Sequence, residues 1–310
     1  MNEKKSSLAP DAVVMIRPAF FGYNHDTAIT NVFQQPPDLD EGEIHRKALA
    51  EFDRMVDLLR AHDVEVYLFD DTKEPRKPDA VFPNNWFSFH PDGTVILYPM
   101  HAPIRRTERR KDILDEINRI FPVKRLLDYS EYEKEGIFLE GTGSLVMDYV
   151  NRIAYASISP RTSEILVRKV CNELSLQPVL FHAVDDHNRP VYHTNVVLTV
   201  AEKLSLICLD AVPDEEEQEI LLTSLRDTGH RVIAISNTQM KSFAGNMMEV
   251  MTRHGKPLLI MSETAYRSLL PGQLDAITQL TEILTINVQT IERYGGGSVR
   301  CMMAGVFNQV

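Results

Sequence analysis

The 310-residue sequence has few cysteines, no long apolar run and no strongly basic block. Its three cysteines (Cys171, Cys208 and Cys301) show no paired spacing, which favours reduced thiols in the cytoplasm over disulfides. No run approaches the ~20 apolar residues that a membrane span requires, and the first residues lack the apolar stretch of a secretory signal. A net charge of −11 makes nucleic acid an unfavourable partner. We therefore expect a soluble cytoplasmic protein without membrane or nucleic-acid partners.

Length and composition indicate a globular chain with an unusual organisation. The hydrophobic share is 44% and the charged share is 25%, both ordinary for a globular protein. The length exceeds that of a typical single domain, so either two domains or one repetitive domain is expected. The short basic stretch Arg105–Lys111 is interpreted as the start of a solvated helix and not as a phosphate-binding segment.

An internal repeat runs through the chain and consists of an amphipathic helix, a short strand and two further extended segments. The helices are predicted from apolar periodicity at Ile44–Ala61, Thr107–Ile120, Arg161–Leu174, Asp214–Arg226 and Pro271–Thr281. The strands that follow them are predicted at Val64–Phe69, Val123–Leu127, Gln177–Phe181, His230–Ile235 and Ile283–Asn287. Extended pairs are predicted for Val81–His90 with Thr94–Tyr98, Gly143–Asp148 with Arg152–Ser157, and Val191–Val200 with Leu204–Leu209. The pattern predicts about five copies of one α/β unit.

Five polar residues recur at comparable points of these units. They are separated by 55, 53, 53 and 55 residues and are Asn85, Glu140, His193, Asn246 and Cys301. In a closed ring of repeats, equivalent positions lie at equal radii, so these side chains would meet at the axis if they face inward. Each has an ordinary structural explanation alone, such as a turn or a helix cap. Cys171 and Cys208 fall in a predicted helix and a predicted strand, which is typical of core thiols.

Several of these positions lie in distinctive segments: Pro78–Trp86 (PDAVFPNNW), Phe138–Ser144 (FLEGTGS), Tyr192–Asn195 (YHTN), Phe243–Asn246 (FAGN) and Gly295–Cys301 (GGGSVRC). Together they resemble the guanidino-group-modifying superfamily, which includes arginine deiminases, dimethylarginine dimethylaminohydrolases and amidinotransferases. The resemblance runs from Met15 to the C-terminus and is strongest to the citrulline-utilisation hydrolase branch. It implies a five-bladed α/β propeller, the pentein fold, as a single catalytic domain over residues 11–310. Residues 1–10 are expected to be flexible, and neither a metal nor an organic cofactor is implied.

The same resemblance implies three catalytic residues. Cys301 would be the nucleophile, His193 the general acid and base, and Glu140 an anchor for substrate nitrogens. A guanidino or ureido carbon is a poor electrophile, and a covalent thio-intermediate replaces one difficult step with two easier ones. The nucleophile must be a thiolate, and an imidazole suits the successive donation and removal of a proton.

Substrate contacts are expected from a further set of residues, namely Asn84, Asn85, Asn195, Asn246, Arg17, Gly141 and Gly297. Arginine-directed relatives usually carry carboxylates in the segment corresponding to Phe82–Trp86 and two residues after the catalytic histidine, where this chain has asparagines. A guanidinium presents only donors, whereas a ureido group also offers a carbonyl acceptor that an asparagine amide can satisfy. The asparagines therefore favour a neutral ureido amino acid, first of all citrulline, cleaved to ornithine, ammonia and carbon dioxide.

Arg17 opens a long loop that extends to Pro37 and that we expect to act as a lid. Its guanidinium is a candidate for binding the substrate carboxylate, with a structural ion pair as the alternative. The glycines Gly141 and Gly297 would allow backbone and substrate to approach closely. The stretch Asp185–His187 is interpreted as a solvated loop and not as a metal site, because further spaced ligands are missing.

Alternative functions stay open at this point. They are an arginine or dimethylarginine deiminase-type hydrolase, an amidinotransferase with an amine acceptor, and a non-catalytic binding protein such as the ribosome-associated factor that shares the fold. A nearby carboxylate from Asp79, Asp148, Asp185 or Asp186 would restore an arginine-type site. The sequence also leaves open whether the protein forms a homo-oligomer.

Overall fold

A computed structural model describes residues 9–307 of the protein. Within this range, fifteen strands form five three-stranded sheets of the same design. In every sheet the central strand runs antiparallel to one neighbour and parallel to the other. The sheets are β3 (Phe87–Phe89), β4 (Thr94–Leu97), β5 (Arg125–Asp128); β6 (Val146–Asp148), β7 (Ile153–Ser157), β8 (Gln177–Phe181); β9 (Leu198–Val200), β10 (Leu204–Ile207), β11 (Arg231–Ala234); β12 (Met248–Met251), β13 (Pro257–Ser262), β14 (Glu282–Ile286); and β15 (Ala304–Val306), β1 (Ala12–Arg17), β2 (Glu65–Asp70).

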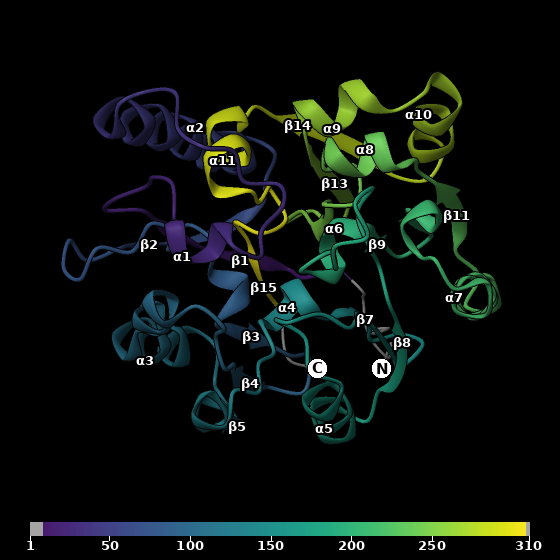
Figure 1. The fold of residues 1–310 in the computed structure, drawn as a ribbon, viewed down its shortest axis with the longest axis horizontal. Helices are drawn as coiled ribbons and strands as arrows, with labels where there is room; N and C mark the ends of the chain where they lie inside the picture. The colour runs from purple at the N-terminus through teal and green to yellow at the C-terminus, as the bar shows by residue number, and fades with distance from the viewer. Residues whose placement is uncertain (1–8, 308–310) are drawn as a thin grey trace.

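The sheet that contains β1 joins the two ends of the chain. Strand β15 runs antiparallel to β1, with Val13 opposite Gly305, and β2 runs parallel to β1 on its other side. The colours in Figure 1 accordingly run once around the molecule and return to the starting region, where the yellow α11 lies beside the purple α2. The last repeat unit is thus completed by the first strand of the chain, and the ring of units closes.

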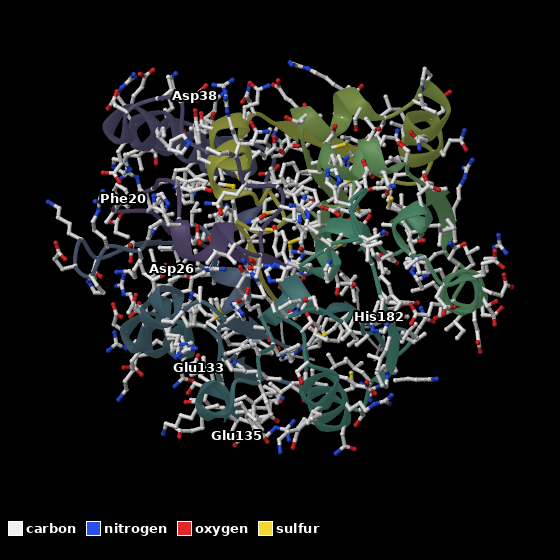
Figure 2. All side chains as sticks on the ribbon, viewed as in Figure 1. Phe20, Asp26, Asp38, Glu133, Glu135 and His182 are labelled. Atoms are coloured by element: carbon white, nitrogen blue, oxygen red, sulfur yellow. The ribbon has the colours of Figure 1, made fainter. Side chains whose placement is uncertain are left out.

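The long helices lie on the outside of this ring, around the sheets (Figure 1). They are α2 (Glu41–Ala61), α3 (Lys111–Ile120), α5 (Glu164–Leu174), α7 (Glu215–Asp227) and α10 (Pro271–Thr278). Shorter helices are α1 (His25–Ala28), α4 (Gly141–Ser144), α6 (Thr194–Val197), α8 (Asn237–Lys241), α9 (Glu263–Ser268) and α11 (Gln289–Gly295), with 3-10 turns η1 (Pro83–Asn85), η2 (Pro103–Glu108), η3 (Ser130–Glu135) and η4 (Leu209–Ala211). Charged side chains such as Asp38, Glu133 and Glu135 lie toward the rim in Figure 2.

Each outer helix packs an apolar face on its sheet because its buried residues recur at helical spacing. In α2 the buried face is formed by Ile44, Ala48, Phe52, Met55, Val56 and Leu59. Helix α2 begins after Asp40, whose side chain accepts a hydrogen bond from the backbone N–H of Glu43 at 3.0 Å. Helix α7 begins after Asp214 in the same way, with three glutamates in its first turn, where the helix dipole favours negative charge.

The predicted pentein fold is confirmed, with local corrections. The predicted helix Thr107–Ile120 is wrong in its first turn, because Pro103 starts a 3-10 turn that ends at Glu108 and α3 begins only at Lys111. The extended run Val191–Val200 is interrupted by α6 and the run Val81–His90 by η1. Cys171 in α5 and Cys208 just after β10 are buried, as predicted for core thiols.

Two further expectations concern the start of the chain and membranes. The flexibility expected for residues 1–10 concerns mainly residues 1–8, which lie outside the described range. Within that range Ala9 is buried, and the carbonyl of Pro10 accepts a hydrogen bond from the N–H of Met251 at 2.9 Å. Between residues 9 and 307, no helix has the length and apolar character needed to cross a membrane.

Candidate active site

The five recurring polar residues each lie just before the first strand of a sheet. Asn85 ends η1 ahead of β3, Glu140 is the N-cap of α4 ahead of β6, and His193 is the N-cap of α6 ahead of β9. Asn246 and Cys301 precede β12 and β15 in the same way. Because the repeat places these turns at equivalent positions, side chains that are distant in sequence come together. All five are almost completely buried.

Cys301 is one of the residues that line a small pocket. Of the residues expected at the site, Cys301, His193, Asn85 and Gly297 line it. The remaining lining residues are Asn31, Asp79, Phe82, Arg105, Arg161, Tyr192, Gly295 and Gly296. The pocket thus combines a thiol, an imidazole, two carboxamides, a carboxylate and two guanidinium groups.

His193 and Glu140 form a buried hydrogen-bonded pair. Nε2 of His193 lies 2.8 Å from Oε2 of Glu140, which fixes the imidazole and leaves Nδ1 as its second ring nitrogen. Burial lowers the pKa of His193 to about 4, although the bond to Glu140 and its charge act in the opposite direction. Burial alone would raise the pKa of Glu140, but the Arg161 charge and the His193 bond outweigh it and hold that pKa well below its usual range. At neutral pH the pair is therefore a neutral imidazole beside a carboxylate.

Asn85 is held in one orientation by Arg105. Its Oδ1 accepts a hydrogen bond from Nη1 of Arg105 at 2.8 Å, and Arg105 is in turn paired with Glu108 at 2.8 Å. Rotating the amide would place its NH₂ group against the guanidinium donors, so the assignment of oxygen and nitrogen is fixed by chemistry. Nδ2 of Asn85 is buried and has no hydrogen-bond partner within residues 9–307.

Three residues of the long N-terminal loop, which we expect to act as a lid, are hydrogen-bonded to segments around the pocket, and Asn31 itself lines it. Nδ2 of Asn31 donates to the carbonyl of Gly295 at 3.2 Å, and Nε2 of Gln34 donates to the carbonyl of Tyr294 at 2.8 Å. On the other side, Nη2 of Arg161 donates to the carbonyl of Thr27 at 3.0 Å. With the loop in this position, the exposed fraction of Cys301 is only 3%. The loop is thus hydrogen-bonded to Gly295 and Arg161, which line the pocket together with Cys301.

Gly143 and Gly141 lie so close to other residues of the site that a Cβ atom would not fit at either position. A Cβ on Gly143 would lie 2.5 Å from Nδ2 of Asn85 and 2.7 Å from Nδ1 of His193. Gly141 has a φ of +50°, and a Cβ there would meet the carbonyl oxygen of Asn84 at 2.2 Å. The expected role of Gly141 in substrate contact is therefore replaced by a packing role, because it lets η1 and α4 touch.

Several expected substrate contacts are corrected by the structure. Arg17 pairs with Asp53 on α2, with Nε 2.7 Å from Oδ1, and does not line the pocket. Glu140 is completely buried, and its two carboxylate oxygens already accept hydrogen bonds from His193, Arg161 and the backbone N–H of His101. Asn84, Asn195 and Asn246 also lie outside the pocket lining.

The two cationic residues of the pocket, Arg105 and Arg161, were not predicted from the sequence. Arg105, expected on a solvated helix, is 2% exposed, and Arg161, expected to start a helix, is equally buried. A repeat-based signal exists, since Arg105 follows Asn85 by 20 residues and Arg161 follows Glu140 by 21 residues. Asp79, considered only as an alternative carboxylate, lines the pocket, and burial raises its pKa. Asp185 pairs with Arg189 at 2.7 Å in a loop and is buried, so the solvated-loop interpretation is wrong for Asp185, whereas its neighbours Asp186 and His187 are exposed.

Comparisons with known proteins agree with this arrangement. A family model described as N,N dimethylarginine dimethylhydrolase, eukaryotic, matches residues 17–308. A search of curated protein sequences found no significant match.

Solved structures share the fold at low sequence identity. The substrate-bound N-terminal domain of ArgZ, an arginine dihydrolase from the ornithine-ammonia cycle in cyanobacteria, is 13% identical with a TM-score of 0.74, over 96% of this chain and 98% of that one. An adduct of dimethylarginine dimethylaminohydrolase with S-methyl-L-thiocitrulline is 17% identical with a TM-score of 0.65, over 96% of this chain and 99% of that one. Apo ArgZ is longer: at 15% identity and a TM-score of 0.74, the match covers 96% of this chain but 41% of ArgZ.

The family match and the five-sheet ring lead to the same assignment. The chain belongs to the dimethylarginine dimethylhydrolase family of the guanidino-modifying pentein superfamily.

Proposed function

We propose that the protein is a cysteine-dependent hydrolase of a ureido amino acid, with citrulline as the first candidate. The superfamily consists of enzymes that act on guanidino and related groups, and the chain shares its fold with hydrolases. In this proposal residues 11–310 form one catalytic domain that works without a metal or an organic cofactor. The single observation that carries the choice of substrate is the orientation of Asn85.

The free Nδ2 of Asn85 is a hydrogen-bond donor that an acceptor on the substrate would satisfy. Its oxygen is already used by Arg105, so the amide offers the pocket only N–H donors. The ureido group of citrulline has a carbonyl oxygen that can accept such a bond, whereas a guanidinium has donors only. A donor facing a donor leaves both unpaired at a cost of about 1–3 kcal/mol, which favours citrulline over arginine.

Both guanidinium groups of the pocket are paired with carboxylates. Arg105 and Arg161 line the pocket, and their carboxylate neighbours Glu108 and Glu140 lie outside the lining. Asp79 is the one carboxylate among the lining residues, and its Oδ2 accepts from Asn24 at 2.8 Å and from Thr27 at 3.2 Å. The pocket therefore has no surplus of positive charge, and its charge alone does not decide between a guanidinium and a neutral ureido group.

Arg161, and not Arg17, is our candidate for binding the substrate carboxylate. Its Nη2 and Nε contact only the carbonyl of Thr27 and the hydroxyl of Thr30. Both threonines belong to the N-terminal loop that we expect to act as a lid. A substrate carboxylate would be a stronger partner for this fork than these neutral oxygens. We therefore assign the α-carboxylate of the amino acid to Arg161.

The chemistry then proceeds in two balanced steps. In the first, the Cys301 sulfur bonds to the ureido carbon, the thiol proton passes through His193 to the departing nitrogen, and ammonia leaves, which gives an S-carbamoyl intermediate. In the second, His193 removes a proton from water, the water oxygen bonds to the carbonyl carbon, and the C–S bond breaks. The thiol regains its proton, and the released carbamic acid decomposes to carbon dioxide and ornithine.

Incubation with citrulline, arginine and methylated arginines tests the proposal directly. We expect ornithine and one ammonia per citrulline consumed, with little turnover of the cationic substrates, because the donor-rich pocket disfavours them. The measurement is chromatographic quantification of ornithine and citrulline with an enzymatic ammonia assay. Formation of citrulline from arginine or methylarginine as the end product, or transfer of an amidino group to an added amine, would contradict it.

An arginine dihydrolase is the second candidate, and one observation favours it. Oδ1 of Asp79 is a buried carboxylate oxygen on the pocket without a partner in the described range, and it could accept a guanidinium N–H. Structures of an arginine dihydrolase also share the fold. In that case arginine would give ornithine with two ammonia molecules, and citrulline would be consumed only as an intermediate.

Replacement of Asn85 by aspartate should shift the substrate preference. One carboxylate oxygen would still accept from Arg105, and the other would replace the free N–H donor with an acceptor. We expect kcat/KM for citrulline to fall about 10- to 100-fold and that for arginine to rise, because the acceptor now suits guanidinium donors. Both values are measured by ammonia release.

The matched control is Asn118→Asp. Asn118 lies on α3, and its Oδ1 accepts from the N–H of Val123 at 2.9 Å, a bond that aspartate retains. This variant carries the same change of charge far from the pocket and should leave the ratio of the two kcat/KM values unchanged. An unchanged ratio in Asn85→Asp would remove Asn85 from the recognition of the ureido group.

A further inference from the structure

Two buried carboxamides aim their nitrogens at the Cys301 sulfur from behind the pocket. Nδ2 of Asn246 lies 3.3 Å from Sγ, and Nδ2 of Asn195 lies 3.6 Å from it. Their residues are 0% and 1% exposed, and neither lines the pocket. Both amides therefore contact the nucleophile itself. We call Asn195 and Asn246 the sulfur-facing amides.

The amide of Asn246 is held with its nitrogen toward the sulfur. Its Nδ2 also donates to the carbonyl of Asn195 at 2.8 Å, while its Oδ1 accepts from the backbone N–H of Arg300 at 3.2 Å. A flipped amide would oppose a donor to the N–H of Arg300 and an acceptor to the carbonyl of Asn195, so the orientation is fixed. Oδ1 is 3.7 Å from Sγ, farther than Nδ2.

The thiolate needs such donors because other sources of positive charge are weak here. A neutral ureido substrate brings no cation, and burial keeps His193 neutral at neutral pH. The guanidinium groups that share the pocket each have an acidic neighbour, Glu108 for Arg105 and Glu140 for Arg161. Asp79 and Tyr192 also line the pocket, and neither supplies positive charge. Arg300 precedes Cys301 in the chain, but burial lowers the pKa of its guanidinium, and its Nη1 donates to the carbonyl of Met303 at 3.4 Å.

We propose that Asn246 and Asn195 are catalytic residues that hold the negative charge of the Cys301 thiolate in the free enzyme. N–H donors stabilise an anionic sulfur, and in a buried site this stabilisation is stronger than in water. The amides thereby replace the positive charge that a guanidino substrate would bring to the thiolate. This explanation of why the two amides are needed rests on the proposed function, in which the substrate is neutral.

Alkylation of Cys301 by iodoacetamide in the absence of substrate tests this role. The rate is measured at about pH 7 and at about pH 10, where a thiol is largely ionised without assistance. Asn195 is the cleaner site for substitution, since its side chain makes no hydrogen bond other than that to Sγ among the described residues. We expect the ratio of the rate at the lower pH to that at the higher pH to fall about tenfold in Asn195→Ala. It should fall further in Asn195→Asp, whose carboxylate repels the thiolate.

Asn246→Ala extends the test to the closer amide and should lower the same ratio. A variant that merely disturbs the site would change both rates together and leave the ratio unchanged, which would overturn the proposal. Peptide mapping separates Cys301 from Cys171 and Cys208, which lie on different peptides, and burial raises the pKa of those two thiols to about 12 and about 11. Since no citrulline is present, the result does not depend on the substrate panel, and the two proposals can fail separately.

Discussion

The Cys301→Ser variant is expected to lose at least four orders of magnitude in kcat while keeping its fold. A serine hydroxyl is far less acidic than a thiol, so it does not form the anionic nucleophile that a ureido carbon requires. The substitution is nearly isosteric at a residue that is 3% exposed, so the melting temperature should change little. Steady-state ammonia release measures the loss, and thermal unfolding by circular dichroism measures stability.

Cys208→Ser is the matched control for this prediction. Its Sγ lies 3.2 Å from Oδ1 of Asn237, a contact that a hydroxyl can keep, and it is remote from the pocket lining. This variant should retain full turnover per folded molecule. In the wild type, rapid quenching with citrulline should reveal a mass adduct on the peptide that carries Cys301. Turnover of Cys301→Ser within tenfold of the wild type would exclude the covalent mechanism.

Replacement of Glu140 by glutamine is expected to have the second largest effect. The carboxylate orients His193 at 2.8 Å and raises its proton affinity against burial. A neutral amide removes that charge and allows the wrong tautomer, so kcat should fall about a thousandfold. Arg161, 3.4 Å from the same carboxylate, also loses its counter-charge, which should destabilise the fold by about 3 kcal/mol. Initial rates and chemical denaturation measure the two effects.

Glu249→Gln separates this role from the general loss of a buried acid. Glu249 is 7% exposed, accepts a hydrogen bond from the backbone N–H of Glu202 at 2.8 Å, and lies outside the pocket lining. Burial raises the pKa of Glu249, so a neutral amide suits its site and turnover should be unchanged. If Glu140→Gln lost stability but kept its turnover per folded molecule, Glu140 would be a structural residue only.

The repeat was readable from the sequence because each unit obeys the same local rules. Apolar residues at helical spacing predicted the outer helices, and α5 begins and ends at Glu164 and Leu174, within the predicted stretch Arg161–Leu174. The nearly equal separations of Asn85, Glu140, His193, Asn246 and Cys301 placed them at equivalent turns, which the structure shows directly before the first strands of the five sheets. Local periodicity thus identified the fold and which residues share a position in it.

Other features depend on contacts between distant segments. Arg161 reaches the carbonyl of Thr27 across 134 residues, and Asn195 reaches the Cys301 sulfur across 106 residues. Local sequence patterns contain no information about such contacts. From the sequence we therefore predicted that Arg17 lies in the site and that Arg105 is exposed to solvent. The structure pairs the first with Asp53 and buries the second beside Asn85.

By itself the sequence determined the ring of repeats and the identity of the residues on its axis, because helix faces, strands and turn spacing are local properties. Only the tertiary structure decided what each side chain touches. Glu140 is hydrogen-bonded to His193, Asn246 faces the sulfur, and Asn85 presents its donor because Arg105 occupies its acceptor. These assignments follow from the direction of each hydrogen bond, and that direction is fixed only when five separate units are packed against one another.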